Sequence, residues 1–277
     1  MAQPGKTRLD DIGILALLGA GKMGSAMLDG WLALGLDPGN VVVVEPQPSP
    51  ELLALAQRGV ALNPSAGAIS NIATLVLAVK PQVAADVMPS VAAMAEEGTL
   101  VLSIMAGKTL AFLAQGLPGS AIVRAMPNTP AAIGRGITVA IANAAVSDAQ
   151  RERAQRLLSA SGAVEWIDDE SLMDAVTAVS GSGPAYIFLL AEALTRAGVS
   201  AGLPPELAEK LARETVAGAG EMLHRSPLDA ATLRQNVTSP GGTTAAALDI
   251  LLSSEGLDPL MREAVLAAAR RSRELAG

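Results

Sequence analysis

The chain has 277 residues, of which 50% are hydrophobic and only 2% are aromatic. This length allows two domains or one large domain with an aliphatic core. The formal net charge of −7 and the absence of a basic run argue against nucleic acid and against an anionic membrane surface. The absence of Cys excludes disulfides, thiolate catalysis and Cys-based zinc sites, and it fits a cytoplasmic protein. No apolar stretch reaches the roughly 20 residues of a membrane span.

A glycine-rich turn follows the first apolar run, residues 12–18, and precedes a helix-forming segment at residues 25–34. It consists of Gly19, Ala20, Gly21, Lys22, Met23 and Gly24, in the G-x-G-x-x-G spacing of a dinucleotide-binding loop. Gly19 permits a tight turn, Gly21 lets backbone N–H groups approach a pyrophosphate, and Gly24 brings the helix close to the strand. The order of strand, turn and helix predicts a dinucleotide site. A glycine-rich turn without a ligand is the alternative.

Further β-branched or aliphatic runs predict strands over residues 40–44, 74–79, 100–104, 121–125 and 163–166. Intervening segments predict helices over residues 51–58, 82–95, 110–115 and 148–160. Strands that alternate with helices as far as about residue 142 indicate an α/β fold with a parallel, doubly wound sheet of the Rossmann type. The polar run at residues 168–170 marks a change in composition. It divides the chain into a dinucleotide-binding domain, residues 1–169, and a helical domain, residues 170–277.

Ligands of a doubly wound sheet bind at the carboxyl ends of its strands. Glu45 ends the second strand about 20 residues after Gly24, where this fold places the acid that binds the adenosine ribose. Lys80 ends a later strand, and we expect it to contact the ligand, although a solvated lysine is the alternative. The remaining residues expected to bind the cofactor from the strand ends are Ala78, Val79, Pro81, Met105, Ala106, Gly107 and Asn128.

The second domain shows no strand pattern. Ala- and Leu-rich segments predict helices over residues 184–197, 205–223, 229–236, 243–252 and 259–275. The helix after Pro184 is apolar on every side, which is typical of a buried helix. A domain of this size offers little protein to bury it, so we expect a homodimer whose helices interleave. A well-packed monomeric bundle is the alternative.

Few residues outside the glycine-rich turn are of types that act as catalytic groups or metal ligands. The single His, His224, lies in an Ala- and Leu-rich helix and is interpreted as structural, and no ligand spacing predicts a metal site. A cofactor must therefore carry the difficult step. Two Ser-, Gly- and Pro-rich loops, residues 179–186 and 237–244, each open a helix and could bind a small-molecule substrate. N–H groups at the helix start of the second loop suit a carboxylate, although both loops could be simple N-caps.

Five sequence blocks carry a close resemblance to the pyrroline-5-carboxylate reductase family, nearly from end to end. They are G-x-G-x-M-G at 19–24, A-V-K-P at 78–81, R-x-M-P-N-T-P at 124–130, S-G-S-G-P-A-Y at 180–186 and S-P-G-G-T-T at 239–244. The resemblance implies an N-terminal Rossmann domain and a C-terminal helical domain that interlocks in a dimer. In many members such dimers assemble into a ring of five.

The resemblance also implies the reaction: reduction of the cyclic imine 1-pyrroline-5-carboxylate to L-proline by NAD(P)H, the last step of proline biosynthesis. It gives Thr244 the catalytic hydrogen bond to the imine nitrogen. The N–H groups of Gly242, Thr243 and Thr244 are expected to hold the substrate carboxylate. The other residues that the resemblance assigns to the substrate loop or places near the ring and the nicotinamide are Ser239, Gly241, Glu170 and Asn236.

The cofactor preference and the class of reaction leave alternatives. Most bacterial relatives use NADPH, yet Glu45 repels a 2′-phosphate and no Lys or Arg occurs between Val41 and Gln57, which favours NADH at least equally. A β-hydroxyacid-type dehydrogenase would need a K-x-x-x-N helix, whereas Glu214 stands four residues after Lys210. A related imine reductase and a non-catalytic nicotinamide-binding protein are the remaining alternatives.

Overall fold

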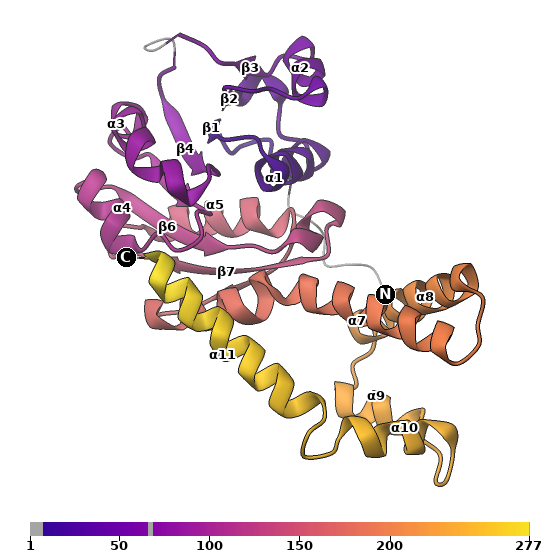
Figure 1. The fold of residues 1–277 in the computed structure, drawn as a ribbon. Coiled ribbons are helices and arrows are strands. Elements are labelled where there is room, and N and C mark those ends of the chain that lie inside the picture. Colours follow the sequence, from indigo (N-terminus) through magenta and orange to yellow (C-terminus); the bar gives the residue numbers. More distant parts are fainter. Residues whose placement is uncertain (1–7, 66–68, 277) are drawn as a thin grey trace. The chain divides into compact units, whose positions relative to one another are not determined.

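The computed structural model describes residues 8–65 and 69–276 and contains two compact units (Figure 1). The first comprises Met1–Gly181 and Ala269–Gly277, and the second comprises Ser182–Ala268. Residues 1–7 and 66–68 of the expected first domain, and residue 277 of the second, lie outside the described residues.

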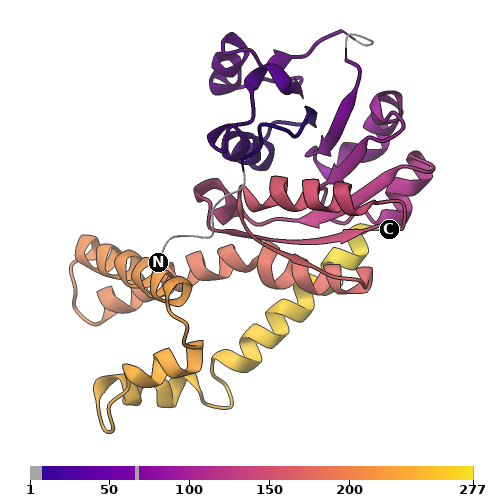
Figure 2. The ribbon, with the colours of Figure 1, turned by 180° about the vertical axis from the view of Figure 1, so that it is seen from behind.

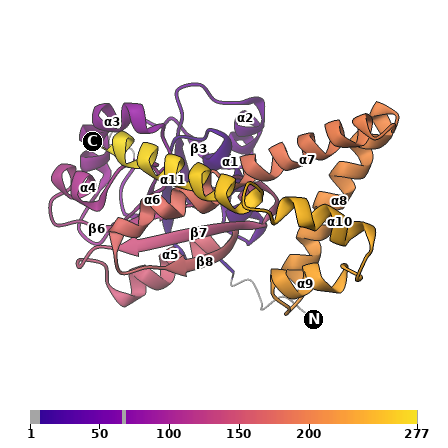
Figure 3. The ribbon, with the colours of Figure 1, turned by 60° about the horizontal axis from the view of Figure 1, so that its bottom comes forward.

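The first unit extends to Gly181 rather than to Asp169, because the intervening segment packs on the sheet. Met173, which begins helix α6 (Met173–Val176), is buried in a cluster with Val139 and Ile141. The end of helix α11 (Leu257–Ala276) belongs to the same unit and lies beside α6 (Figure 3). There the Ser272 hydroxyl donates a hydrogen bond of 2.6 Å to the Asp174 carboxylate.

An eight-stranded sheet in the order β3-β2-β1-β4-β5-β6-β7-β8 forms the centre of the first unit. Its strands are β1 (Ile14–Leu18), β2 (Val41–Val44), β3 (Ala61–Leu62), β4 (Ile72–Leu77), β5 (Leu100–Ser103), β6 (Ala121–Met126), β7 (Gly136–Ala142) and β8 (Gly162–Trp166). Each predicted strand is confirmed within about two residues, whereas the two-residue edge strand β3 and the seven-residue strand β7 were not predicted. Most of these strands are buried on both faces, which explains why they read as continuous aliphatic runs.

The prediction of an all-parallel sheet is wrong at one strand. β7 runs antiparallel to β6, with Arg124 opposite Ile141, and every other pair is parallel. A parallel partner would need a crossover of a dozen or more residues, usually through an α-helix. The chain between β6 and β7 instead holds only a short 3₁₀ segment, Thr129–Ile133, so it reverses direction.

Helices cover both faces of the sheet (Figures 1 and 2). Three of them, α1 (Lys22–Ala33), α2 (Pro50–Gln57) and α5 (Asp148–Ser159), contribute side chains to one core cluster. The other face carries α3 (Ala84–Met94) and α4 (Leu110–Gly116), which contribute to a second cluster. This distribution of helices is the doubly wound arrangement that the sequence predicts.

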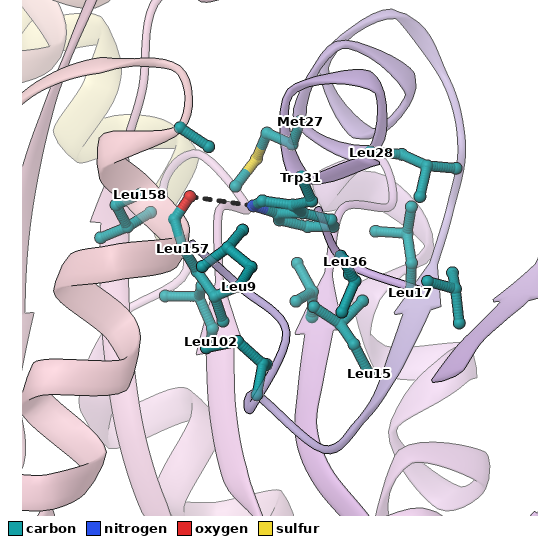
Figure 4. Close-up of a cluster of buried hydrophobic side chains, with 14 of the residues drawn as sticks. Leu9, Leu15, Leu17, Met27, Leu28, Trp31, Leu36, Leu102, Leu157 and Leu158 are labelled. Carbon is teal, nitrogen blue, oxygen red and sulfur yellow. Dashed lines mark hydrogen bonds between the residues drawn. The ribbon is translucent and has the colours of Figure 1, made fainter. Parts of the chain in front are cut away.

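Trp31 joins two helices inside the first core cluster (Figure 4). Its side chain is fully buried, and its indole N–H donates a hydrogen bond of 2.9 Å to the carbonyl oxygen of Leu157 on α5. Met27, Leu28 and Leu158 belong to the same cluster. The bond satisfies the single polar atom of the indole, so the largest side chain of the core carries no unpaired donor.

The second unit is helical, as predicted, with α7 (Gly183–Ser200), α8 (Pro205–Arg225), α9 (Ala230–Asn236), α10 (Thr243–Leu251) and the first part of α11. One expectation at its border is wrong. Residues 179–186 do not open α7 as a loop, because Thr177–Gly181 forms a π-helical turn between α6 and α7. The hydroxyls of Thr177 and Ser180 donate hydrogen bonds to carbonyl oxygens four residues earlier, a pattern that often bends a helix.

The apolar helix α7 contains no buried residue within a single chain. Phe188 is 64% exposed and Leu189 is 56% exposed. A surface of this kind is typical of a contact with another protein chain rather than of a monomeric bundle. Among residues 8–65 and 69–276, no helix is long and apolar enough to cross a membrane.

Candidate active site

The glycine-rich turn between β1 and α1 has the geometry that its spacing predicts. Gly19 adopts φ +88°, a conformation that favours glycine. A Cβ at Gly24 would lie 2.3 Å from the Gly19 carbonyl oxygen, so only glycine lets the helix approach the strand this closely. A Cβ at Gly21 would meet nothing within 4 Å, because this residue faces open space at the start of α1. The turn therefore fits a pyrophosphate at Gly21 and the helix N-terminus.

Glu45 follows β2 and reaches back to this turn. One carboxylate oxygen accepts a hydrogen bond of 2.9 Å from the backbone N–H of Ala20, and the other accepts one of 3.0 Å from Gln47. Each oxygen retains a further lone pair that can accept a bond from a ribose hydroxyl. The predicted ribose acid thus lies beside the predicted phosphate loop and is held there by two backbone amides.

A cavity of about 590 Å³ opens at this edge of the sheet. Its walls include Gly19, Gly21, Glu45, Gln47, Lys80 and Asp86. The volume lies in the range of small-molecule and cofactor sites. Lys80 is exposed and lines the cavity together with Ala78 and Val79, and contact of these residues with the cofactor stays a prediction. This cavity contains the glycine-rich turn, whereas a larger cavity of about 760 Å³ between α7 and α8 does not.

Other predicted cofactor residues lie at or just after the ends of β4, β5 and β6, and their bonding and burial differ. The Ala78 N–H extends the sheet by bonding to the Leu18 carbonyl oxygen at 2.8 Å. Met105 is 2% exposed and packs in the second core cluster, so its side chain anchors the loop after β5 to the core. The Asn128 side chain accepts a bond of 3.0 Å from the N–H of Ile137, which fixes the loop after β6.

A buried ion pair ties three segments together near these strand ends. The guanidinium of Arg124, at the end of β6, lies 2.6 Å from a carboxylate oxygen of Glu170. The same oxygen accepts a bond of 2.8 Å from the N–H of Leu110 in the first turn of α4. The Arg124 side chain is only 6% exposed, so its charge depends on a close partner. The sequence placed Glu170 near the substrate ring but did not predict this pair.

The loop before α10 is an uncapped helix start. The N–H of Gly242 donates to the carbonyl oxygen of Ser239 at 3.0 Å, and Gly241 adopts φ +68° after Pro240. Pro and a positive-φ Gly at the two central positions are typical of a type II turn. Gly242 is the N-cap of α10 and makes no side-chain cap bond, so the first N–H groups of this helix lack a side-chain oxygen as acceptor.

The expected cofactor residues from Gly19 to Asn128 lie in the first unit, whereas Asn236 and the substrate loop 239–244 lie in the second. Two residues hold predicted site residues in place by contacts that the sequence does not predict: Arg124, which pairs with Glu170, and Asn63, whose side chain pairs with the backbone of Glu45. Asn63 stands next to Pro64 and looks like an ordinary turn residue in the sequence, so only the tertiary pairing distinguishes it.

The turn, the strand-end acid and the cavity define the first unit as a dinucleotide-binding domain of the kind found in nicotinamide-dependent oxidoreductases. The family model described as "NADP oxidoreductase coenzyme F420-dependent" matches residues 14–107. The model described as "Pyrroline-5-carboxylate reductase dimerisation" matches residues 170–275. Dimerisation through the helical domain is thus a property of the family that this domain matches.

Whole-chain comparisons agree with these models. The pyrroline-5-carboxylate reductase of Synechocystis is 43% identical over 94% of this chain and 97% of the relative. That of Pseudomonas aeruginosa is 40% identical over 95% and 96%. The solved structure of the Coxiella burnetii enzyme matches with a TM-score of 0.88 and 36% identity, covering 96% of this chain and all of that one. The chain belongs to the pyrroline-5-carboxylate reductase family.

Proposed function

We propose that this chain reduces 1-pyrroline-5-carboxylate to L-proline with a reduced nicotinamide cofactor, as the last step of proline biosynthesis. The observation that carries the proposal is that the chain matches its relatives across both domains and retains both the glycine-rich turn and the uncapped helix start of α10. A dinucleotide-binding domain alone would leave the substrate open.

The proposed reaction requires the protein mainly to bind and orient its substrate and cofactor. Reduction adds a hydride to the imine carbon and leaves the nitrogen protonated, and the bound nicotinamide supplies the hydride. The imine nitrogen is basic enough to arrive largely protonated near neutral pH, so no strong acid is required. Thr244 then needs only to form a hydrogen bond with this nitrogen and hold the ring in orientation.

The substrate carboxylate is assigned to the start of α10. The N–H groups of Thr243 and Thr244 point out of an uncapped helix N-terminus, which favours an anion. The N–H of Gly242 closes the turn onto Ser239, so this cradle has one donor fewer than the sequence suggests. Ser239, Gly241 and Gly242 shape the cradle, and Glu170 and Asn236 stay predicted contacts of the ring and the nicotinamide.

For the cofactor, we propose that NADH is used at least as well as NADPH. Glu45 is fixed beside the glycine-rich turn, where its charge opposes a 2′-phosphate and its oxygens accept ribose hydroxyls. Asp86 adds a second carboxylate to the cavity wall, and Lys80 is a cation there. By contrast, the Plasmodium falciparum structure, at 30% identity and a TM-score of 0.81, has NADP bound.

The test is the loss of nicotinamide fluorescence when 1-pyrroline-5-carboxylate is added to the enzyme with NADH or NADPH. Oxidised cofactor with a series of hydroxy acids serves as the comparison for a β-hydroxyacid dehydrogenase. Turnover of the imine supports the proposal, whereas turnover of only a hydroxy acid, or of nothing, contradicts it. A kcat/KM about a hundredfold higher with NADPH than with NADH, equivalent to about 2.7 kcal/mol, would overturn the cofactor preference.

We also propose that the exposed face of α7 is covered by a second copy and that such dimers can assemble into a pentamer of dimers. Ile187, Phe188, Leu189 and Leu190 are all about half exposed or more in the single chain, which supports a self-association surface. Sedimentation at micromolar concentration should show multiples of the 28.0 kDa chain, and a single 28.0 kDa species would contradict the dimer.

A cytoplasmic location completes the proposal and is tested by cell fractionation.

A further inference from the structure

Asn63 bonds the backbone of one residue, Glu45, through both polar atoms of its side-chain amide. Its Oδ1 accepts a hydrogen bond of 2.9 Å from the Glu45 N–H, and its Nδ2 donates one of 2.9 Å to the Glu45 carbonyl oxygen. Its own N–H donates to the carbonyl oxygen of Val43 at 2.8 Å. These three bonds hold the end of β2 against the residue that follows β3.

The backbone pairing of β2 with β3 ends at Asn63. Strand β3 has only two residues, and the positive φ of Asn63 turns the chain out of the extended conformation that a longer ladder needs. The Asn63 amide therefore replaces the next pair of ladder bonds. Asn63 adopts φ +48°, which Asn tolerates better than most residues, so its identity suits both the backbone and the pairing.

The consequence concerns the Glu45 carboxylate. Its backbone is held by Asn63, and its two oxygens are held by the N–H groups of Ala20 and Gln47. A carboxylate fixed at both ends cannot turn away from a 2′-phosphate, whereas a carboxylate on an unpaired backbone can. Discrimination between ribose and phosphorylated ribose then depends on how firmly Glu45 is held.

We infer that Asn63 is a positioning residue that sets nucleotide selectivity by holding Glu45 against the glycine-rich turn. This inference rests on the proposed cofactor site. Asn63 acts through Glu45 and needs no contact with the nucleotide. Its loss should weaken NADH binding while affecting NADPH binding less, because the held carboxylate favours the first and opposes the second.

The chain offers a matched control in Asn71. Asn71 also has a positive φ, +59°, and is also exposed, but it precedes β4 and so lies at the opposite edge of the sheet from the cavity. Glycine accepts such a backbone in both places, so Asn63→Gly and Asn71→Gly remove a side chain without imposing backbone strain. Only the first removes the pairing with Glu45.

Binding constants for NADH and NADPH are measured by nicotinamide fluorescence titration without any imine, so the result does not depend on turnover. We expect Asn63→Gly to raise the Kd for NADH about tenfold, equivalent to about 1.4 kcal/mol, and the Kd for NADPH by less than about twofold. Asn71→Gly should change neither by more than about twofold.

The dependence on Glu45 is tested by adding Asn63→Gly to Glu45→Gln, where it should no longer change the NADH-to-NADPH ratio. An unchanged Kd for NADH, an equal rise for both nucleotides, or a ratio shift that persists in the Glu45→Gln background would each overturn the inference. Wild-type protein that binds neither nucleotide would overturn the cofactor site along with it. Wild-type protein that binds nucleotide but reduces no imine would refute only the proposed function.

Discussion

Replacing Glu170 by Ala should destabilise the first unit strongly, because it breaks the buried ion pair with Arg124. The substitution leaves the Arg124 guanidinium, whose side chain is 6% exposed, without the carboxylate that lies 2.6 Å away. It also removes the acceptor of the Leu110 N–H at the start of α4. The three segments that meet at Glu170 would lose their common contact.

The magnitude follows from burial. Breaking a buried pair by removing one partner costs about 3–5 kcal/mol, because the remaining charge stays desolvated. Glu170 is itself 27% exposed, and water at the site screens the pair, so we take about 3 kcal/mol. At about 2–4 °C per kcal/mol for a unit of this size, Tm should fall by about 6–12 °C.

Calorimetry of the full-length protein measures this change in the transition of the first unit. Glu274→Ala is the control, because it removes a partner from Arg271 in an exposed pair, with side chains 61% and 67% exposed, and should shift Tm by less than about 3 °C. Glu170→Gln keeps an oxygen for the Arg124 and Leu110 N–H groups and should lie between the two. A Glu170→Ala variant no less stable than Glu274→Ala would refute the reasoning.

Three further predictions concern the turn, the cradle and helix α9. Gly21→Ala should weaken NADH binding but keep the wild-type Tm, since its Cβ meets nothing within 4 Å. Gly24→Ala should weaken NADH binding and also lower Tm, because its Cβ would lie 2.3 Å from the Gly19 carbonyl oxygen. Thr244→Ala should lower kcat about ten- to a hundredfold in a stopped-flow assay with the Kd for NADH unchanged, and a variant with full kcat would show that another group bonds the imine. The N–H of Thr232 lowers the pKa of the Asp229 carboxyl at the N-cap of α9. The stability from this cap is therefore present above the ordinary carboxyl pKa and lost as the pH falls through the lower folded value, and Asp229→Asn should remove that part of the pH dependence of Tm.

Local sequence determined much of the first unit. A dinucleotide-binding turn is specified locally by the glycines at 19, 21 and 24, by the acid after β2 and by the aliphatic runs. The roles of these residues depend on neighbours within a few tens of residues, so the sequence alone predicts them. The helices of the second unit were predictable for the same reason, since Pro at helix starts and Ala- and Leu-rich periodicity act locally.

Tertiary structure decided the rest. Strand β7 pairs with β6 on one side and with β8 on the other, and local sequence does not give these partners. The π-helical turn at Thr177–Gly181 includes Ala178, which is fully buried, although the sequence there is typical of a loop. The pairs Arg124–Glu170 and Asn63–Glu45 join residues far apart in the chain, so neither partner reveals the other in the sequence. The sequence by itself determined which groups could bind a nucleotide. Only the folded chain decided which side chains hold those groups in place, because that depends on contacts between distant segments.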